Sequence, residues 1–182
     1  VEGYTNPLWT LWMALLHVPP IPDSKASLAV MLSGAAILVA NVWVVARIAA
    51  IVSGGSAFVA TLASWLTAFY YGLAFWTLRG TEVGALTLLV DASLLCVLGT
   101  SAMSRRRLTG LSLLLAAAVL VRPDGIVPAA VIALFAVVAA PRAERFRRGA
   151  ILAGALALPL VANTAFRLAY YGDPLPNTYY LK

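Results

Sequence analysis

The sequence predicts an all-α fold, a polytopic transmembrane helical bundle. Of the 182 residues, 62% are hydrophobic and only 11% are charged. The mean hydropathy of +0.91 excludes a water-soluble globular domain. Long apolar runs alternate with short connections rich in arginine, proline and glycine, as in proteins that cross the bilayer several times. The single cysteine, Cys96, and the single histidine, His17, leave no disulfide framework and no zinc site of clustered histidines or cysteines.

The first predicted helix, residues 7–18, is juxtamembrane. Asn6 stands at its N-cap position and Pro7 at its first helical position, which are favourable places for both residue types. The helix is too short to span the bilayer, and Trp9 and Trp12 share one face of it. These features are typical of a helix that lies in the membrane interface.

The remaining apolar runs predict six further helices, each separated from the next by glycine, proline or arginine. Their predicted ranges are 26–47, 57–78, 83–100, 107–121, 126–140 and 149–168. Residues 169–182 are predicted to form an extracytoplasmic loop. We expect residues 1–182 to make one transmembrane domain that is an internal fragment of a longer protein, because the chain starts without a methionine and stops just after a polar stretch.

A charged, helix-breaking insert divides the apolar run from Leu108 to Ala140. As one helix this run would be roughly 50 Å long, far more than the ~30 Å hydrocarbon core. Pro123 and Gly125 therefore predict a reversal between two short helices, each about 21 Å long. Arg122 would then be held at a depth where charge is costly, and a charge in such a place indicates a functional site.

The distribution of arginine predicts the orientation of the bundle. One set of connections holds Arg47, residues 105–107 and residues 142–148, a net charge of about +7. The opposite set is close to neutral, so the basic side is predicted to be cytoplasmic. The pI of about 9.9 is then a consequence of topology and does not indicate binding to nucleic acid.

The near-neutral side gathers four separated loops with charges of both signs. Arginine or lysine there could bind a phosphate, and a carboxylate could take a proton from an attacking hydroxyl group. This is the chemistry that an anionic lipid substrate requires. The same residues would also serve a structural network of salt bridges.

Four motifs, taken together, resemble those of bacterial GT-C membrane glycosyltransferases, and in particular the group that contains the mycobacterial terminal arabinofuranosyltransferase. In chain order the motifs are Glu2-Gly3-Tyr4-Thr5-Asn6-Pro7-Leu8-Trp9, Gly80-Thr81-Glu82, Arg122-Pro123-Asp124-Gly125, and Tyr170-Tyr171-Gly172-Asp173-Pro174-Leu175-Pro176-Asn177-Thr178 with Lys182. They spread over essentially the whole chain. The resemblance implies that the chain is a GT-C-like N-terminal membrane module.

The resemblance also implies an activity and a location. The donor would be a polyprenyl-phosphate sugar carrying arabinofuranose or another pentose or hexose. The acceptor would be a glycan, lipid or protein of the cell envelope. Transfer would occur on the extracytoplasmic face of the bacterial plasma membrane, usually with inversion at the anomeric carbon.

Roles for individual residues follow from the resemblance. It implies that Arg122 and Lys182 bind the donor phosphate. The residues that would contact substrate are Glu2, Tyr4, Asn6, Glu82, Asp124, Tyr171, Asp173 and Asn177. The catalytic base of such enzymes lies upstream of the first motif, so this chain alone is expected to be inactive.

The residue patterns define no metal site and require no cofactor. A divalent cation among Glu82, Asp124 and Asp173 would suit the preference of Mg²⁺ or Ca²⁺ for oxygen ligands, but no spacing rule calls for one.

Structural interpretations stand beside the functional ones. Arg122 could pair with Asp124 only to stabilise the turn, and Glu82 could pair with Arg79. Asp91 is interpreted as a residue of helix packing. For the whole chain, the alternatives to the transferase are a transporter or flippase for a lipid-linked or anionic substrate, and a noncatalytic membrane scaffold.

Overall fold

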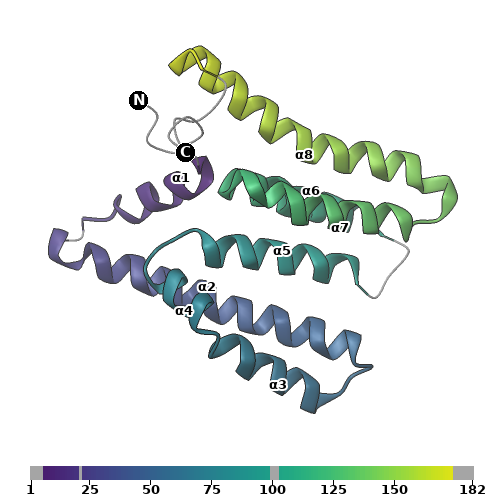
Figure 1. Cartoon of the computed structure of the whole chain (residues 1–182), viewed down its shortest axis with the longest axis horizontal. Coiled ribbons are helices and arrows are strands. Elements are labelled where there is room, and N and C mark those ends of the chain that lie inside the picture. Colours follow the sequence, from purple (N-terminus) through teal and green to yellow (C-terminus); the bar gives the residue numbers. More distant parts are fainter. Residues whose placement is uncertain (1–5, 21, 99–102, 174–182) are drawn as a thin grey trace.

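The computed structural model describes residues 6–20, 22–98 and 103–173, and in these ranges it contains helices and no strand (Figure 1). The prediction of an all-helical chain is confirmed for this part. The helices are α1 (Pro7–Leu16), α2 (Asp23–Val52), α3 (Ala57–Ala68), α4 (Tyr71–Leu78), α5 (Val83–Val97), α6 (Arg105–Val121), the 3₁₀ turn η1 (Pro123–Gly125), α7 (Ile126–Val138) and α8 (Arg142–Tyr171).

Two of these helices are long and apolar enough to cross a membrane. They are α2 and α8, each of 30 residues and therefore about 45 Å long. The pair α3 and α4 would count as a third span if it were one bent element. The length and the composition of these helices therefore support a membrane protein.

Helix α2 continues past its predicted end. The prediction placed the end at Arg47, but the helix runs to Val52 and is followed by Gly54 and Gly55, whose φ angles are 68° and 95°. Arginine is a good helix former, whereas two consecutive left-handed glycines cannot continue a right-handed helix. The end of α2 is therefore determined by the glycines.

The predicted single helix over residues 57–78 is wrong. The chain bends by 53° between α3 and α4, at Phe69 and Tyr70. The bend brings α4 against two glycines on neighbouring helices: a Cβ atom added to Gly34 of α2 or to Gly84 of α5 would overlap Thr77 of α4. The break between α3 and α4 therefore coincides with close packing of α4 against these two glycines. The break itself, at Phe69 and Tyr70, contains no proline or glycine that would indicate it in the sequence.

Helix α8 is longer than predicted at both ends. The prediction gave residues 149–168, but the helix begins at Arg142 and ends at Gly172, whose φ of 75° is a typical left-handed helix end. The predicted loop 169–182 is therefore wrong at its start, because Tyr171 is helical. Smaller differences occur at other ends: α1 stops at residue 16, α6 starts at 105 and α7 stops at 138.

The apolar core is formed by α5, α6, α7 and α8. Leu111 and Leu115 of α6 are completely buried there. In contrast, α3 has no buried residue, and Phe58 on it is 75% exposed. Apolar surface of this kind would be unfavourable in water but is expected against lipid. The other buried residues of the core are Val97, Leu108, Ala129, Ile132, Ala133, Ala136 and Leu152.

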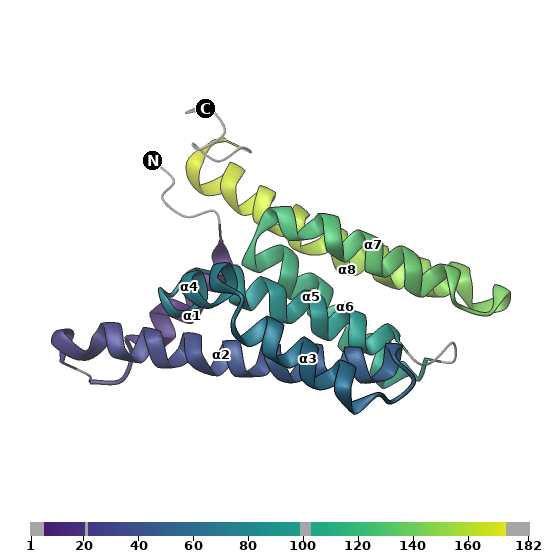
Figure 2. The same cartoon turned by 60° about the horizontal axis from the view of Figure 1, so that its bottom comes forward.

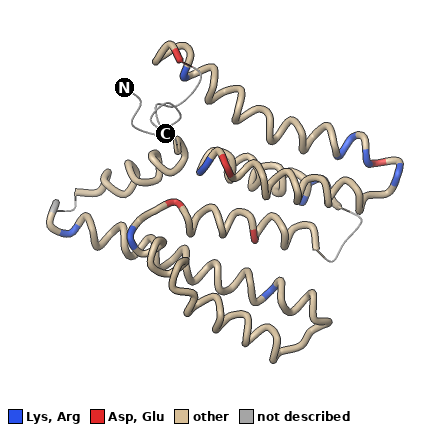
Figure 3. The backbone as a smooth tube through the Cα atoms, in the orientation of Figure 1, with Lys and Arg blue, Asp and Glu red and all other residues tan. Residues whose placement is uncertain are grey.

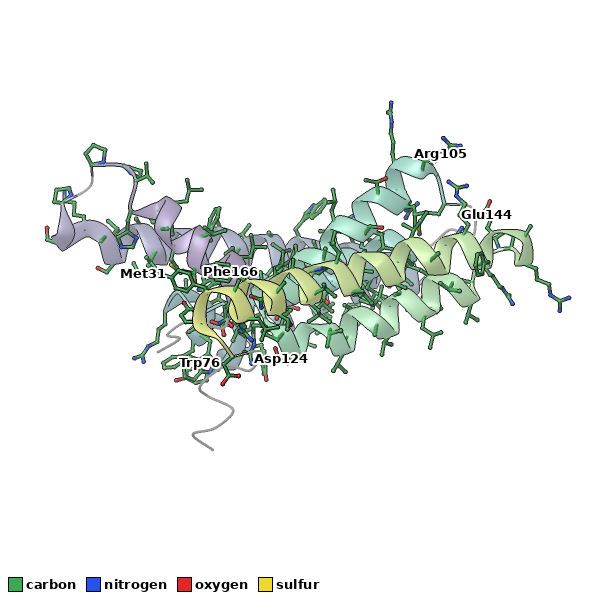
Figure 4. The ribbon with its side chains drawn as sticks, turned by 90° about the horizontal axis from the view of Figure 1, so that it is seen from above. Met31, Trp76, Arg105, Asp124, Glu144 and Phe166 are labelled. Atoms are coloured by element: carbon green, nitrogen blue, oxygen red, sulfur yellow. The ribbon has the colours of Figure 1, made fainter. Side chains whose placement is uncertain are left out.

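Most charged residues lie toward the ends of the helices, and one acidic residue, Asp91, lies midway along α5 (Figure 3). Arg105 and Glu144 lie at one end of the bundle, and Asp124 and Phe166 lie toward the other (Figure 4). Arg105 and Glu144, from the predicted basic set, thus lie opposite Asp124, from the predicted near-neutral set. Which side of a membrane each end faces stays a prediction.

Three arginines at the basic end close the C-termini of α5 and α7. Arg107 donates from Nε to the Cys96 carbonyl at 2.7 Å. Arg145 donates from Nε to the Ala140 carbonyl at 3.0 Å and from Nη2 to Val138 at 2.9 Å, and Arg148 donates from Nη1 to Ala136 at 3.1 Å. Each satisfies carbonyls that a helix end leaves open, and the positive charge is favourable at the negative end of the helix dipole.

Candidate functional site

The turn between α6 and α7 is built as predicted. Arg122 ends α6 in extended conformation, with φ −152° and ψ 132°, and residues 123–125 then form η1. At Gly125 a Cβ atom would lie 2.7 Å from the Ala118 carbonyl oxygen, so the reversal is too tight for any other residue type without a shift of the backbone. Pro123 and Gly125 thus position Arg122 at the end of the bundle.

Arg122 contacts two carboxylates from different elements. Its Nε and Nη2 donate to Oδ1 and Oδ2 of Asp124 at 2.9 and 2.8 Å. Its Nη1 lies 3.5 Å from Oε1 of Glu82, at the start of α5. The side chains of Arg122, Asp124 and Glu82 are 35%, 61% and 20% exposed. We call these three residues the charge cluster.

The alternative pairing of Glu82 with Arg79 is wrong. The Arg79 guanidinium lies over the Phe75 ring, 4.3 Å from its centre, in a cation–π contact. Glu82 is therefore directed to Arg122. This pairing joins the loop before α5 to the turn after α6, which are forty residues apart in the chain.

Helix α1 is attached to the loop that carries Glu82. Trp9 donates from Nε1 to the Gly80 carbonyl at 3.1 Å, and Trp12 donates from Nε1 to Ser33 Oγ on α2 at 2.9 Å. Gly80 has φ 79°, a conformation that favours glycine. Asn6 and Pro7 occupy the predicted N-cap and first positions of α1, although the Asn6 side chain makes no capping hydrogen bond.

An open apolar groove of about 420 Å³ is lined by residues of α1, α2, α5 and α6. Val121, which lines the groove, immediately precedes Arg122, and Ala85 follows Glu82 by one helical turn. The volume is within the range of small-molecule sites, and the lining suits a hydrocarbon chain. The remaining lining residues are Leu8, Trp9, Leu11, Trp12, Leu15, Ile37, Leu88 and Leu89.

The other predicted site residues belong to the two ends of the chain, and several are outside the described residues. Tyr171 packs against Tyr170 and Phe166 at the end of α8, with ring centres 4.8 and 6.3 Å apart. Asp173 follows this helix end, which lies toward the same end of the bundle as η1 (Figure 2). The structure does not describe Glu2, Tyr4, Asn177 or Lys182.

Both carboxylates of the charge cluster contact the guanidinium of Arg122. Within residues 6–20, 22–98 and 103–173, no group of three or more histidine, cysteine, aspartate or glutamate side chains could hold a metal ion. A divalent cation among Glu82, Asp124 and Asp173 stays a prediction.

Two polar residues lie inside the bundle. Asn41 of α2 is fully buried, a position that the sequence analysis passed over, and donates from Nδ2 to the Gly84 carbonyl of α5 at 3.0 Å. A lone asparagine in a long apolar run could have been the signal for this interhelical contact. Asp91 is half-buried nine residues after Glu82 on α5, about 13 Å along the helix, and its packing role stays a prediction.

No family model, curated protein or solved structure matches this chain. Its function is therefore argued from the motifs and from the geometry of the charge cluster and the groove.

Proposed function

We propose that the chain is the donor-binding membrane module of a glycosyltransferase in the bacterial plasma membrane. It holds a polyprenyl-phosphate sugar so that the sugar is transferred to a cell-envelope glycan, lipid or protein on the extracytoplasmic face. The observation that carries the proposal is that Arg122, which contacts Glu82, directly follows Val121, a residue that lines an apolar groove.

A polyprenyl-phosphate sugar has two parts that need opposite surroundings. Its hydrocarbon chain suits the groove between α1, α2 and α5, which is lined by leucine, isoleucine and tryptophan. Its phosphate suits a guanidinium, which binds phosphate oxygens in bidentate fashion. Val121 lines the groove and Arg122 is the next residue in the chain, so the apolar lining and the guanidinium come from neighbouring residues.

Arg122 would assist the reaction through the leaving group. The acceptor hydroxyl gives its proton to a carboxylate base and its oxygen bonds to the anomeric carbon. The bond from that carbon to the phosphate oxygen breaks, and polyprenyl phosphate leaves with the electron pair. The phosphodiester donor carries one negative charge, whereas the phosphate monoester that leaves carries about −1.5 to −2 at pH 7. A fixed cation stabilises the transition state more than the ground state, because the charge grows as the bond breaks.

The two carboxylates keep Arg122 in position before the donor binds. Asp124 occupies the Nε and Nη2 edge of the guanidinium, but it is 61% exposed and so its ion pair is weakened by water. The donor phosphate would replace Asp124 on this edge. Glu82 on the other edge would hold the guanidinium in place and is available to hydrogen-bond hydroxyl groups of a sugar.

Arg122→Ala in the full-length protein is the direct test. With a polyprenyl-phosphate sugar as donor, we expect the rate of sugar transfer to fall by about 10²–10³, the usual effect of removing one group that stabilises a developing oxyanion. Arg122→Lys retains the charge but not the bidentate geometry, so we expect an intermediate rate. Arg106→Ala, at the opposite end of the bundle, is the matched control. Transfer that is unchanged in Arg122→Ala would exclude Arg122 from the mechanism.

A transporter or flippase is the second candidate, since transporters also build their sites at breaks in helices and the 53° bend between α3 and α4 is such a break. The charge cluster lies at one end of the bundle, whereas transporter sites lie near the midplane. Translocation of a fluorescent lipid-linked sugar in liposomes, without transfer to an acceptor, would favour this alternative.

A further inference from the structure

The arginines at the end of the bundle where α6 and α8 begin are of two kinds. Arg107, Arg145 and Arg148 are used in capping helix ends. The others are exposed and form no hydrogen bond or ion pair with any described residue: Arg105 and Arg106 on α6, and Arg142 and Arg147 on α8. Capping accounts for the first group and leaves the second unexplained.

Two of these exposed arginines line one recess. It lies between the first turns of α6 and α8, has a volume of about 50 Å³ and is lined by Met103, Arg105, Leu108, Glu144, Arg147 and Arg148. Figure 4 shows Arg105 and Glu144 at this end of the molecule. We call it the arginine recess.

The recess carries an excess of positive charge. Glu144 is its one acidic lining residue, and its Oε2 already accepts from Nη2 of Arg148 at 2.9 Å. The charges of Arg105 and Arg147 are therefore not neutralised from within the described part of the chain. An anion between them would contact a cation on each of two helices.

The size and the surroundings of the recess restrict the class of anion. About 50 Å³ holds roughly three or four water-sized groups, which is enough for a phosphate group. Met103 and Leu108 add apolar wall, and Phe146 on the same turn of α8 is 89% exposed. An exposed aromatic beside arginines is typical of the level of lipid headgroups.

We propose that the arginine recess binds the phosphate of an anionic phospholipid, with Arg105 and Arg147 as its ligands. The lipid joins the start of α6 to the start of α8 and so stabilises the packing of these helices. This inference needs the chain to lie in a membrane, but it does not depend on glycosyl transfer or on Arg122.

The test compares two double variants of the full chain in dodecyl maltoside micelles. Arg105→Gln with Arg147→Gln removes the recess pair. Arg106→Gln with Arg142→Gln removes the same charge from the same two helices but leaves the recess intact. The probes are phosphatidylglycerol, phosphatidylcholine with the same acyl chains, and inorganic phosphate. Native mass spectrometry measures lipid binding, and thermal unfolding measures stabilisation.

We expect phosphatidylglycerol to bind and to raise the melting temperature of the wild type and of the control double variant. In the recess double variant we expect its affinity to be roughly thirtyfold lower, from the loss of two contacts with an anionic lipid. If this variant loses its helical content, the single variants Arg105→Gln and Arg147→Gln replace it, each with an expected loss of about fivefold against Arg106→Gln.

Three results would overturn the proposal. An equal loss of binding in both double variants would mean a diffuse positive surface without a site. Equal stabilisation by inorganic phosphate would mean a site for a soluble anion. Equal binding of phosphatidylcholine would mean that the lipid charge is not recognised.

Discussion

Arg122 pairs with carboxylates in a setting where ion pairs contribute little to stability. Its side chain is 35% exposed and that of Asp124 is 61% exposed, so water competes for both charges. If the pair existed only to stabilise the turn, it would be a weak means of doing so, because Pro123 and Gly125 already determine the reversal. The ion pair is therefore expected to add little to the stability of the turn.

A double-mutant cycle separates the two roles. For Arg122→Ala and Asp124→Ala we expect a coupling free energy of about 0.2–1 kcal/mol in unfolding experiments, the range of exposed ion pairs. The measurement is the free energy of unfolding of the two single variants, the double variant and the wild type in detergent. A coupling of several kcal/mol would show that the pair is mainly structural.

The charge cluster was only partly predictable. Arg122 and Asp124 stood out because a charged insert with proline and glycine interrupts an apolar run. That Glu82 contacts Arg122 was not evident, because it depends on where α5 meets η1 and on the Phe75 ring that holds Arg79. The apolar groove depends in the same way on side chains from helices that are distant in the chain.

At the scale of elements, the sequence predicted which segments are helical better than where they end or bend. The prediction ended α2 at Arg47 and left the arginines of residues 142–148 outside α8. In the structure both helices include these arginines. Left-handed glycines after α2 and α8 are the physical ends. The bend between α3 and α4 has no such local signal, and α4 packs closely at Gly34 and Gly84.

The contact at Gly34 gives a prediction with an internal control. Gly34→Ala would place a methyl group against the backbone of Thr77, so we expect it to destabilise the fold by about 1–3 kcal/mol. Gly110→Ala on α6 has no atom within 4 Å of the new methyl group. It should instead be stabilising by about 0.5–1 kcal/mol, through helix propensity alone. Unfolding by sodium dodecyl sulfate in mixed micelles measures both changes, and equal effects of the two substitutions would contradict the packing argument.

The whole molecule has two chemically different ends. One end holds Arg105 and Glu144, which line the arginine recess, and the other holds Asp124 of the charge cluster (Figure 4). The sequence predicted this division from the count of arginines alone. It did not show that Arg107, Arg145 and Arg148 close helix ends, because the carbonyls they meet lie on other helices or across a turn.

Helix α8 offers a test of orientation, because its two ends are exposed and 28 residues apart. In a Cys96→Ala background, we expect Tyr170→Cys to react with a membrane-impermeant maleimide in intact cells. Arg142→Cys should react only after the membrane is made permeable, because the basic end is predicted to be cytoplasmic. Labelling of both positions from the same side would contradict the proposal that α8 spans the membrane.

Helix α1 forms one wall of the groove and yet has no buried residue. Apart from surface packing, the indole hydrogen bonds of Trp9 and Trp12 attach it to the rest of the chain, and each such bond contributes only about 1 kcal/mol. We therefore expect α1 to move away from α2 and from the loop at Gly80 far more readily than the buried helices separate from one another. A lipid-linked molecule could then enter the groove laterally from the surrounding leaflet, and its hydrocarbon tail would not pass through water.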